Sequence, residues 1–186
     1  LDGNLSISAS SDIRRTFTGN VHIGGRNNVS AYNVYDWLNK YLRISIGEET
    51  PRADKIYWYS MGLYVVTQNG FQYDASNHKL SLSCSDLVGK LNDTISGQLT
   101  GYATIIKEGR DIRQSIIETL KLMDINKYMV EYWNRTVPYD LEFSTGATVW
   151  QILTELRDLY YPFEMYFDED TFVCKEIPDC KDDPVI

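Results

Sequence analysis

The side chains that could carry out catalysis are few and scattered. The two histidines, His22 and His78, fall on a predicted polar strand face and in a turn, and neither has a cysteine or histidine at metal-ligand spacing. No Gly-x-Ser-x-Gly turn is present for a serine nucleophile, and Gly24-Gly25 lacks the Lys-Ser/Thr of a phosphate-binding loop. The sequence does not exclude a Ser-His-Asp arrangement. Serine and aspartate are so abundant, however, that no particular residues can be assigned as partners of a histidine. We therefore expect both histidines to be solvated. We also expect that the protein binds no metal and no cofactor and is not an enzyme.

Acidic residues offer two further kinds of chemistry. The run at 168–170 could bind a cation, but a calcium loop needs ligands at fixed offsets and a central glycine, and both are missing. Glu142 with Glu164, or Asp140 with Glu155, could form a glycosidase-like carboxylate pair. Because this half of the chain is rich in acidic residues, we expect a hairpin turn at 168–170 and solvated carboxylates elsewhere.

Two groups of residues are more typical of a subunit interface. Arg14 and Arg15 are adjacent at the start of a predicted strand, so their side chains point to opposite faces. One of them should meet an acidic neighbour, either within the chain or across a subunit contact. Tyr57, Trp58 and Tyr59 add wide aromatic surface, which is enriched at such contacts. We predict these five residues as interface residues.

The charge is unevenly distributed along the 186 residues. The net charge is −8; residues 1–96 contain nine basic and nine acidic residues, and residues 97–186 contain nine basic and 17 acidic ones. This asymmetry predicts a boundary at Ser96-Gly97, with a first domain at 1–96, a second at 97–178 and a tail at 179–186. It argues against a surface that grips nucleic acid, which needs clustered cations. The charge distribution does not argue against a duct through which DNA slides without being bound.

The cysteine count and the hydropathy indicate in which kind of compartment the protein is expected. Cys84, Cys174 and Cys180 cannot all pair, which favours a reducing compartment without disulfides. No apolar run is long enough to span a membrane. The chain begins with Leu1 and ends in a charged tail, so we expect a piece of a longer protein.

The first half is rich in strand signals. Alternation of apolar and polar residues predicts short strands, with Asn69-Gly70 as a tight turn and 48–54 as an exposed loop. The predicted strands cover 5–7, 15–23, 41–47, 56–67 and 80–85. One or two helical turns are expected at 34–41, and a single helical turn at 86–92. This pattern is typical of a small antiparallel β-barrel or sandwich.

The second half has helical periodicity. Apolar residues in steps of three and four predict a helix over 110–124, with Asp111 in its first turn, and a second helix from Val149 to Leu159. Thr148 and Gln151 have the spacing of a capping box. Further alternation predicts a strand at 137–143 and a hairpin over 163–177. We expect an α+β domain with two helices packed on an antiparallel sheet.

Several segments together resemble the phage tail hub protein family. They are Ser10–Thr16, Gly62–Thr67, Leu80–Asn92, Val137–Phe143 with Gly146 and Ile152-Leu153, and Tyr166–Pro178. They follow one another in order over nearly the whole chain. Thr171 departs from the pattern, in which a glycine is expected in the hairpin.

The resemblance implies the N-terminal part of a baseplate or tail-tip hub. Such a protein forms a trimeric ring of tube-type β-barrel domains that continues the tail tube and lets DNA pass. Its partners are other tail proteins, namely the distal tail protein, the tape measure and a fibre or spike, and it is made in the host cytoplasm and located in the virion tail. The alternatives are a carbohydrate-binding or adhesin module of a tail fibre, and a cell-wall hydrolase or its non-catalytic part.

Overall fold

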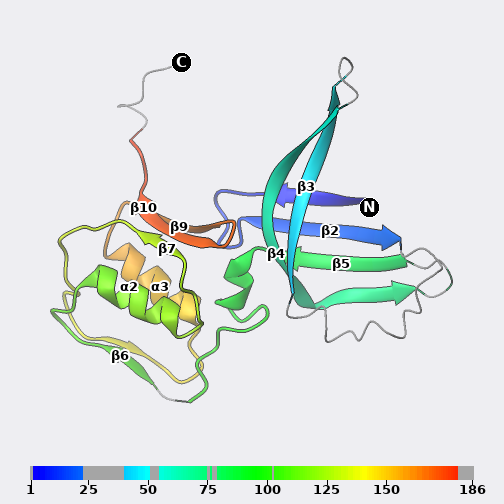
Figure 1. The fold of residues 1–186 in the computed structure, drawn as a ribbon. Coiled ribbons are helices and arrows are strands. Elements are labelled where there is room, and N and C mark those ends of the chain that lie inside the picture. The colour runs from blue at the N-terminus through cyan, green and yellow to red at the C-terminus, as the bar shows by residue number, and fades with distance from the viewer. Residues whose placement is uncertain are drawn as a thin grey trace. The chain divides into compact units, whose positions relative to one another are not determined.

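The chain folds into two compact units, which a computed structural model describes over residues 2–22, 40–50, 55–74, 76, 79–101 and 103–179. The units comprise Leu1–Gly89 and Lys90–Ile186 (Figure 1). The division therefore follows Gly89, whereas the charge distribution places the boundary after Ser96.

Backbone hydrogen bonds explain why residues 91–99 belong to the second unit. The amides of Trp150 and Val149 donate to the carbonyls of Leu91 and Gly97, at 2.9 and 2.8 Å. The Leu99 amide donates to the Ala147 carbonyl at 2.9 Å. These bonds attach the segment to the start of a helix, and the charge count contains no information about them.

The first unit is one curled antiparallel sheet of five strands, which forms half of a barrel (Figure 1). The strands are β1 (Asp2–Ile7), β2 (Arg15–His22), β3 (Tyr41–Thr50), β4 (Lys55–Asp74) and β5 (Lys79–Ser85). Their order is β1-β2-β5-β4-β3. The predicted antiparallel strands are confirmed. Within the described residues, β1 and β3 each pair on one side only, so the sheet does not close there.

The core of this unit lies on one face of the sheet. Its members are buried and come from β2, β4 and β5: Phe17, Tyr64, Val66, Leu80, Leu82 and Cys84. Leu5, Leu42 and Ile44 pack against them. The alternation predicted for 80–85 is confirmed, because Ser81 and Ser83 point to the other face and are only partly buried.

The turn predicted at Asn69-Gly70 is wrong. Strand β4 continues through these residues, and its register with β5 shifts between Val66 and Phe71. An irregularity of this kind absorbs extra residues and bends a strand without reversing it. The predicted loop at 48–54 is also too long, because Glu48, Glu49 and Thr50 belong to β3.

The two predicted helical turns have different outcomes. Residues 34–39 lie outside the described residues, and Tyr41 opens β3. The turn at 86–92 is confirmed as the 3-10 helix η2 (Leu87–Lys90).

The second unit contains two helices and two small sheets. Its elements are β6 (Thr104–Ile106), α2 (Ile112–Lys121), β7 (Tyr128–Val130), β8 (Leu141–Phe143), α3 (Val149–Asp158), β9 (Phe163–Asp168) and β10 (Thr171–Glu176). One sheet has the order β7-β10-β9, and the other pairs β6 with β8. Both predicted helices and the predicted hairpin are confirmed, and the strand predicted at 137–143 is shorter. Among the described residues, no helix is long and apolar enough to cross a membrane.

The sheet beside the helices is mixed and not purely antiparallel as predicted. Strand β7 runs parallel to β10, with Tyr128 opposite Phe172. Strands β6 and β7 were not predicted, because three residues offer too few alternating positions to detect. Their pairing depends on segments far away in the chain.

Both helices begin at a residue whose side chain satisfies a backbone amide. Asp111 is the N-cap of α2, one position before the helix, and accepts a bond from the Gln114 amide at 2.7 Å. Thr148 accepts from the Gln151 amide at 3.1 Å, and the Gln151 side chain accepts from the Thr148 amide at 3.5 Å. The predicted capping box is therefore present.

Candidate functional site

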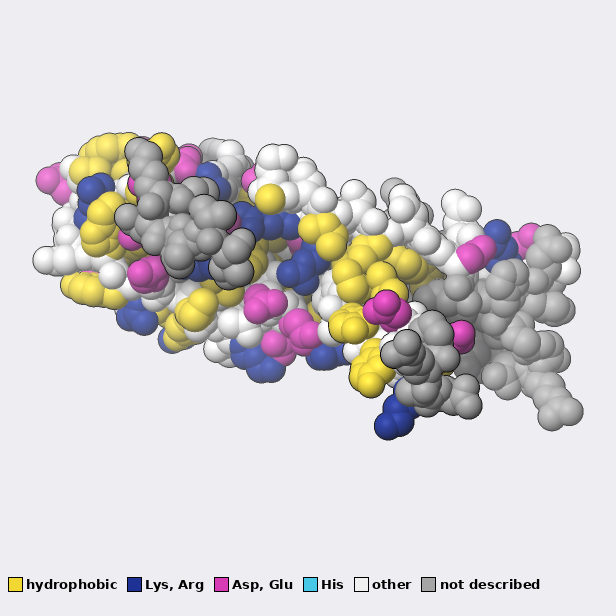
Figure 2. All heavy atoms as spheres, turned by 90° about the horizontal axis from the view of Figure 1, so that it is seen from above, with side chains coloured by type: hydrophobic (Ala, Val, Ile, Leu, Met, Phe, Trp, Pro, Cys, Tyr) yellow, Lys and Arg dark blue, Asp and Glu magenta, His cyan; other side chains and the backbone are white. Residues whose placement is uncertain are grey.

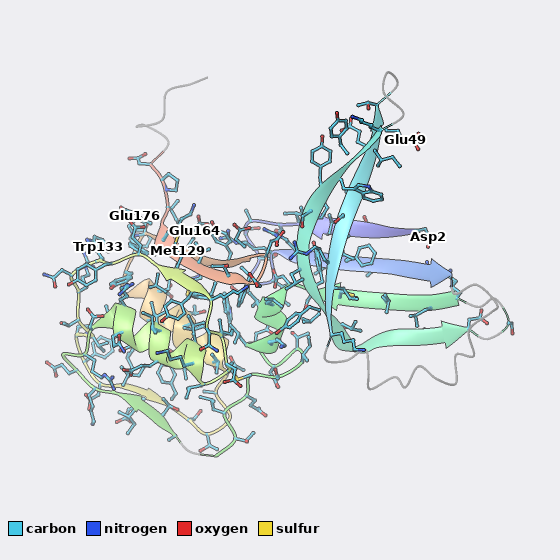
Figure 3. All side chains as sticks on the ribbon, viewed as in Figure 1. Asp2, Glu49, Met129, Trp133, Glu164 and Glu176 are labelled. Carbon is cyan, nitrogen blue, oxygen red and sulfur yellow. The ribbon has the colours of Figure 1, made fainter. Side chains whose placement is uncertain are left out.

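The candidate site of the first unit is a hairpin arm. We define the arm as residues 45–50 of β3 and 55–60 of β4, which run out beyond the other strands of the sheet (Figure 1). Ser45 pairs with Ser60, and the pairing continues without a shift to Thr50 and Lys55. Figure 3 shows Glu49 near the end of the arm.

The predicted interface residues Tyr57, Trp58 and Tyr59 all lie on this arm and are exposed. Trp58 retains 68% of its surface, and the two tyrosines retain 50% and 53%. Ile46 and Ile56 are also about half exposed. Figure 2, which looks from above, shows hydrophobic side chains gathered at the arm. The arm is therefore an apolar surface open to a partner.

Sequence reasoning missed Ile46 and Ile56 as part of this surface. Ile46 alternates with Leu42 and Ile44, which face the core, and was therefore predicted to share their face. The register between β3 and β4 shifts after Ile44, and the arm continues beyond the core. The only available signal was the length of the apolar alternation, which exceeds what one small core can cover.

A glycine lets the aromatic side chains lie close to the arm's backbone. A Cβ atom at Gly47 would stand 2.8 Å from the Ile56 Cγ2 atom and 3.1 Å from the Trp58 ring. Trp58 is directly opposite Gly47 in the ladder. Because Gly47 has no side chain, the Trp58 ring can lie against the backbone of the arm. This contact supports the ring, most of which is exposed.

The predicted arginine pair lies beside a buried carboxylate. The backbone amides of Arg14 and Arg15 donate to Oδ2 of Asp86 at 2.9 and 3.1 Å, and the Val88 amide donates to Oδ1 at 3.1 Å. Asp86 is 3% exposed. This carboxylate joins the start of β2 to the start of η2. Sequence reasoning did not single it out.

The guanidinium of Arg15 acts within the first unit. Its Nη1 atom lies 2.5 Å from the position that a Cβ at Gly62 would occupy, where φ is +113°. Its positive charge also acts on the Asp86 carboxylate. Of the two arrangements predicted for the arginine pair, the acidic neighbour within the chain is therefore present. A subunit contact by Arg14 or Arg15 stays a prediction.

Burial governs the protonation of the groups around this point. Burial raises the pKa of Asp86, while the backbone bonds from Arg15, Val88 and Arg14 and the charge of Arg15 oppose the rise. Burial raises the pKa of the Cys84 thiol to about 11 and also raises the pKa of Tyr64. The Cys84 thiol and the Tyr64 hydroxyl therefore stay protonated at neutral pH.

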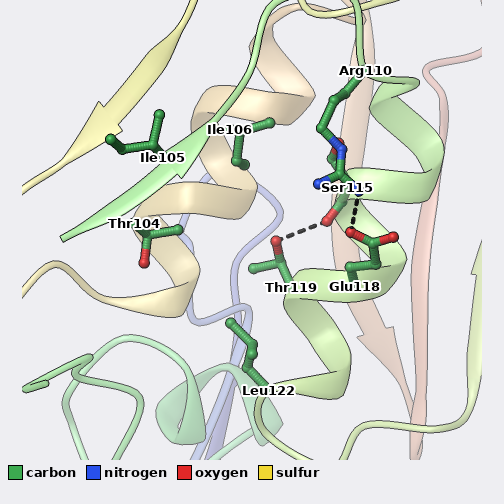
Figure 4. Close-up of a pocket in the computed structure, with 8 residues that line it drawn as sticks. All are labelled: Thr104, Ile105, Ile106, Arg110, Ser115, Glu118, Thr119 and Leu122. Carbon is green, nitrogen blue, oxygen red and sulfur yellow. Dashed lines mark hydrogen bonds and ion pairs between the residues drawn. The ribbon is translucent and has the colours of Figure 1, made fainter. Parts of the chain in front are cut away.

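The second unit has a small pocket of about 170 Å³ between β6 and α2 (Figure 4). Its lining residues are Thr104, Ile105, Ile106, Arg110, Ser115, Glu118, Thr119 and Leu122. Arg110 pairs with Glu118 at 2.6 Å. The hydroxyls of Ser115 and Thr119 donate to carbonyls one helical turn earlier, at 2.8 Å each. The polar side chains of Arg110, Ser115, Glu118 and Thr119 are thus engaged with each other or with the helix.

The other acidic candidates serve structural roles. Asp170, in the turn between β9 and β10, forms an ion pair with Lys127, and the turn residue Glu169 has a positive φ of 51°. Thr171 pairs with Asp168 inside the hairpin. The hairpin turn predicted at 168–170 is therefore confirmed.

The proposed carboxylate pairs do not form a recognisable site. Asp140 binds Lys107 at 2.7 Å, and this bond lowers the pKa of Asp140. Glu142 and Glu164 belong to different sheets. Among the described residues, no three histidine, cysteine or acidic side chains cluster as metal ligands. His78 and the side chain of His22 lie outside the described part.

An aromatic cluster stabilises the end of the second unit. Trp133, which is labelled in Figure 3, stacks on Phe163 with ring centres 5.4 Å apart. The Arg135 guanidinium lies 4.2 Å from the Trp133 ring. The Tyr160 hydroxyl donates to the Trp133 carbonyl at 2.9 Å. These contacts hold the segment after β7 against the end of α3. We therefore assign the cluster a structural role.

Comparison with solved structures shows what this chain is similar to. A solved structure of a tail protein from Neisseria meningitidis MC58 superposes with a TM-score of 0.54 and covers 86% of this chain. The two chains share a fold. Their sequences are 15% identical, and the match covers 42% of the Neisseria chain, so this chain spans less than half of its length. No family model and no curated protein matches the sequence.

Proposed function

We propose that this chain is a structural, non-enzymatic component of a phage or prophage tail, and specifically of the baseplate or tail-tip hub. The observation that supports the proposal most is the fold shared with the Neisseria tail protein across both units. The order of the sequence segments that resemble tail hub proteins supports it independently.

The hub role requires self-association, which we propose to be a trimeric ring continuing the tail tube. The half-barrel of the first unit ends in two outer strands, β1 and β3, each of which has one neighbouring strand in the described sheet. Strands at the edge of a sheet favour pairing with another chain. In this proposal, closure of the tube-type barrel comes with assembly, DNA passes through without being gripped, and other tail proteins stack on the ring.

Immunogold electron microscopy tests the location. Antibodies against the 186-residue chain should label particles produced by the strain that encodes it, at the end of the tail away from the head. Labelling along the whole tail would indicate a tube subunit. A lack of label on intact and on partly disassembled particles would contradict the proposal.

A carbohydrate-binding module is the second candidate, favoured by the exposed Tyr57, Trp58 and Tyr59, since aromatic rings stack on sugars. A glycan array distinguishes it. Binding that is lost in Trp58→Ala would favour this function, whereas no binding to any glycan would remove it. Zymography on cell walls tests the third alternative, a hydrolase, and we expect no clearing.

A further inference from the structure

The arm presents two different faces. In an antiparallel ladder, directly paired residues project their side chains to the same side. The pairing of Ile46 with Tyr59 and of Glu48 with Tyr57 places these four residues on one face, and Lys55 lies on the same side at the next rung. We call this side face one.

Face two is formed by the residues between them. Gly47 pairs with Trp58, and Glu49 pairs with Ile56. Trp58 and Ile56 lie together over the bare backbone of Gly47. Face two is therefore a compact apolar patch with one carboxylate beside it.

Both faces are apolar and both are open. The least exposed of their large apolar side chains, Ile56, retains 48% of its surface. A two-stranded hairpin is only marginally stable in water, and a strand pair with one covered face normally keeps its other face polar. An arm that is apolar on both sides is instead suited to lie between two partners.

Charge and coverage together favour contact between unlike faces. Among the described residues of the arm, face two has Glu49 and no cation, so two copies of face two would oppose carboxylates. Face one contains both Glu48 and Lys55, and this lysine can neutralise Glu49 of another copy. A contact of face one with face one could pair these two charges, but it would leave both copies of face two uncovered.

We propose that face one of the arm packs against face two of the arm in a second copy of this chain, so that identical copies join head to tail. A two-fold contact uses one patch twice, whereas a closed ring of three or more copies needs two different patches on each subunit. The arm supplies both. The inference rests on the ring of the proposed function and identifies the surface that closes it.

Mixing two variants tests the head-to-tail contact. Ile46→Glu disrupts face one and Trp58→Glu disrupts face two, and both positions are exposed, so circular dichroism should be unchanged. In sedimentation velocity the unaltered full chain should form a closed oligomer. Each variant alone should associate at least about tenfold more weakly, as hot-spot losses do at interfaces. An equal mixture should yield heterodimers and nothing larger, because each pair retains one intact junction.

Two controls complete the experiment. Ile105→Glu, at an equally exposed position of the second unit, should leave the oligomer unchanged. Lys55→Glu should weaken association, and adding Glu49→Lys to the same chain should restore it.

The outcomes separate this inference from the proposed function. An oligomer that survives both arm variants overturns the arm contact and leaves the ring intact. A mixture of the two variants that stays monomeric also overturns it. An unaltered chain that is monomeric at every concentration overturns both the arm contact and the ring. Immunogold labelling away from the tail overturns the proposed function alone.

Discussion

A single buried carboxylate joins the start of β2 to the last residues of the first unit. The side chain of Asp86 accepts hydrogen bonds from the backbone amides of Arg14, Arg15 and Val88. The two arginines precede Asp86 by more than seventy positions in the chain. Because an ionised carboxylate accepts without donating, it can serve three amides that would otherwise be unsatisfied. The residue is therefore structural, and its removal should affect β2 before it affects other strands.

Replacing Asp86 with asparagine tests this role. In Asp86→Asn one oxygen becomes an amide group that cannot accept, so either the Val88 amide or the amides of Arg14 and Arg15 lose their acceptor. Unfolding should therefore become easier by about 1–3 kcal/mol. Hydrogen exchange of the β2 amides in denaturant measures the change. The matched control is Asp12→Asn, an exposed position in the preceding turn, which should change little. Equal β2 protection in both variants would contradict the assignment.

The pH dependence of stability in the wild type and in Asp86→Asn tests how burial affects this carboxylate. Because burial raises the pKa of Asp86 above its ordinary value of 3.8, the folded chain binds its proton more readily than the unfolded chain. The contribution of this group to stability is then largest in acid and falls as pH rises through its folded pKa. The stability difference between the wild type and Asp86→Asn should widen from pH 7 towards pH 4, and a narrowing difference would show that the backbone bonds outweigh burial.

At the scale of elements, strands β1 and β2 approach each other through a glycine. A Cβ at Gly19 would stand 2.4 Å from the Phe17 ring and 2.8 Å from the carbonyl oxygen of Asp2. Gly19→Ala should therefore destabilise the first unit by roughly 1–3 kcal/mol, as overpacking does in other cores. Thermal unfolding followed by hydrogen exchange of β1 and β2 measures this. Gly101→Ala, where no atom lies within 4 Å, is the control and should be close to neutral.

The capping box of α3 is a second element-level device. Thr148→Ala removes the acceptor of the Gln151 amide and should lower stability by about 0.5–2 kcal/mol. Thr154→Ala in the same helix should be neutral or slightly stabilising, since alanine is the better helix former. Protection of the first-turn amides of α3 distinguishes the two variants. Equal protection would indicate that the other bonds at the start of α3, from Trp150 and Val149 to Leu91 and Gly97, hold the helix alone.

At the scale of the whole molecule, each unit has its own core and its own buried thiol. Cys84 lies in the first core and Cys174 in the second, and burial raises their pKa values to about 11 and about 12. The thiol of each unit can therefore report on the opening of that unit.

Thiol labelling at pH 8 tests this arrangement in a Cys180→Ser background. A pKa of about 11 leaves roughly a hundredfold less thiolate than the ordinary value of 9.0. Cys84 should therefore react at least about a hundredfold more slowly in the folded than in the unfolded chain, and Cys174 more slowly still. Mass spectrometry of each labelled peptide measures the two rates. Rapid reaction of either thiol in the native chain would show that its core is open.

How far prediction from the sequence succeeds depends on how local the signal is. The alternation of Leu80, Leu82 and Cys84 predicts a strand and its buried face, because both follow from neighbouring residues. Asn69-Gly70 misleads for the same reason, since a strong local turn signal is overridden by pairing with β5. The candidate interface was located at Tyr57, Trp58 and Tyr59, but its contribution from β3 depends on the cross-strand register.

The sequence by itself determined the helices and most strands of this protein, and the division into a β-rich half and an α+β half. These follow from periodicity and composition, which are properties of neighbouring residues. Only the tertiary structure decided that β7 pairs parallel to β10, that residues 91–99 join the second unit, that Asp86 is buried, and that apolar residues line both sides of one arm. Each of these depends on the free energy of bringing distant segments together, which no local pattern encodes.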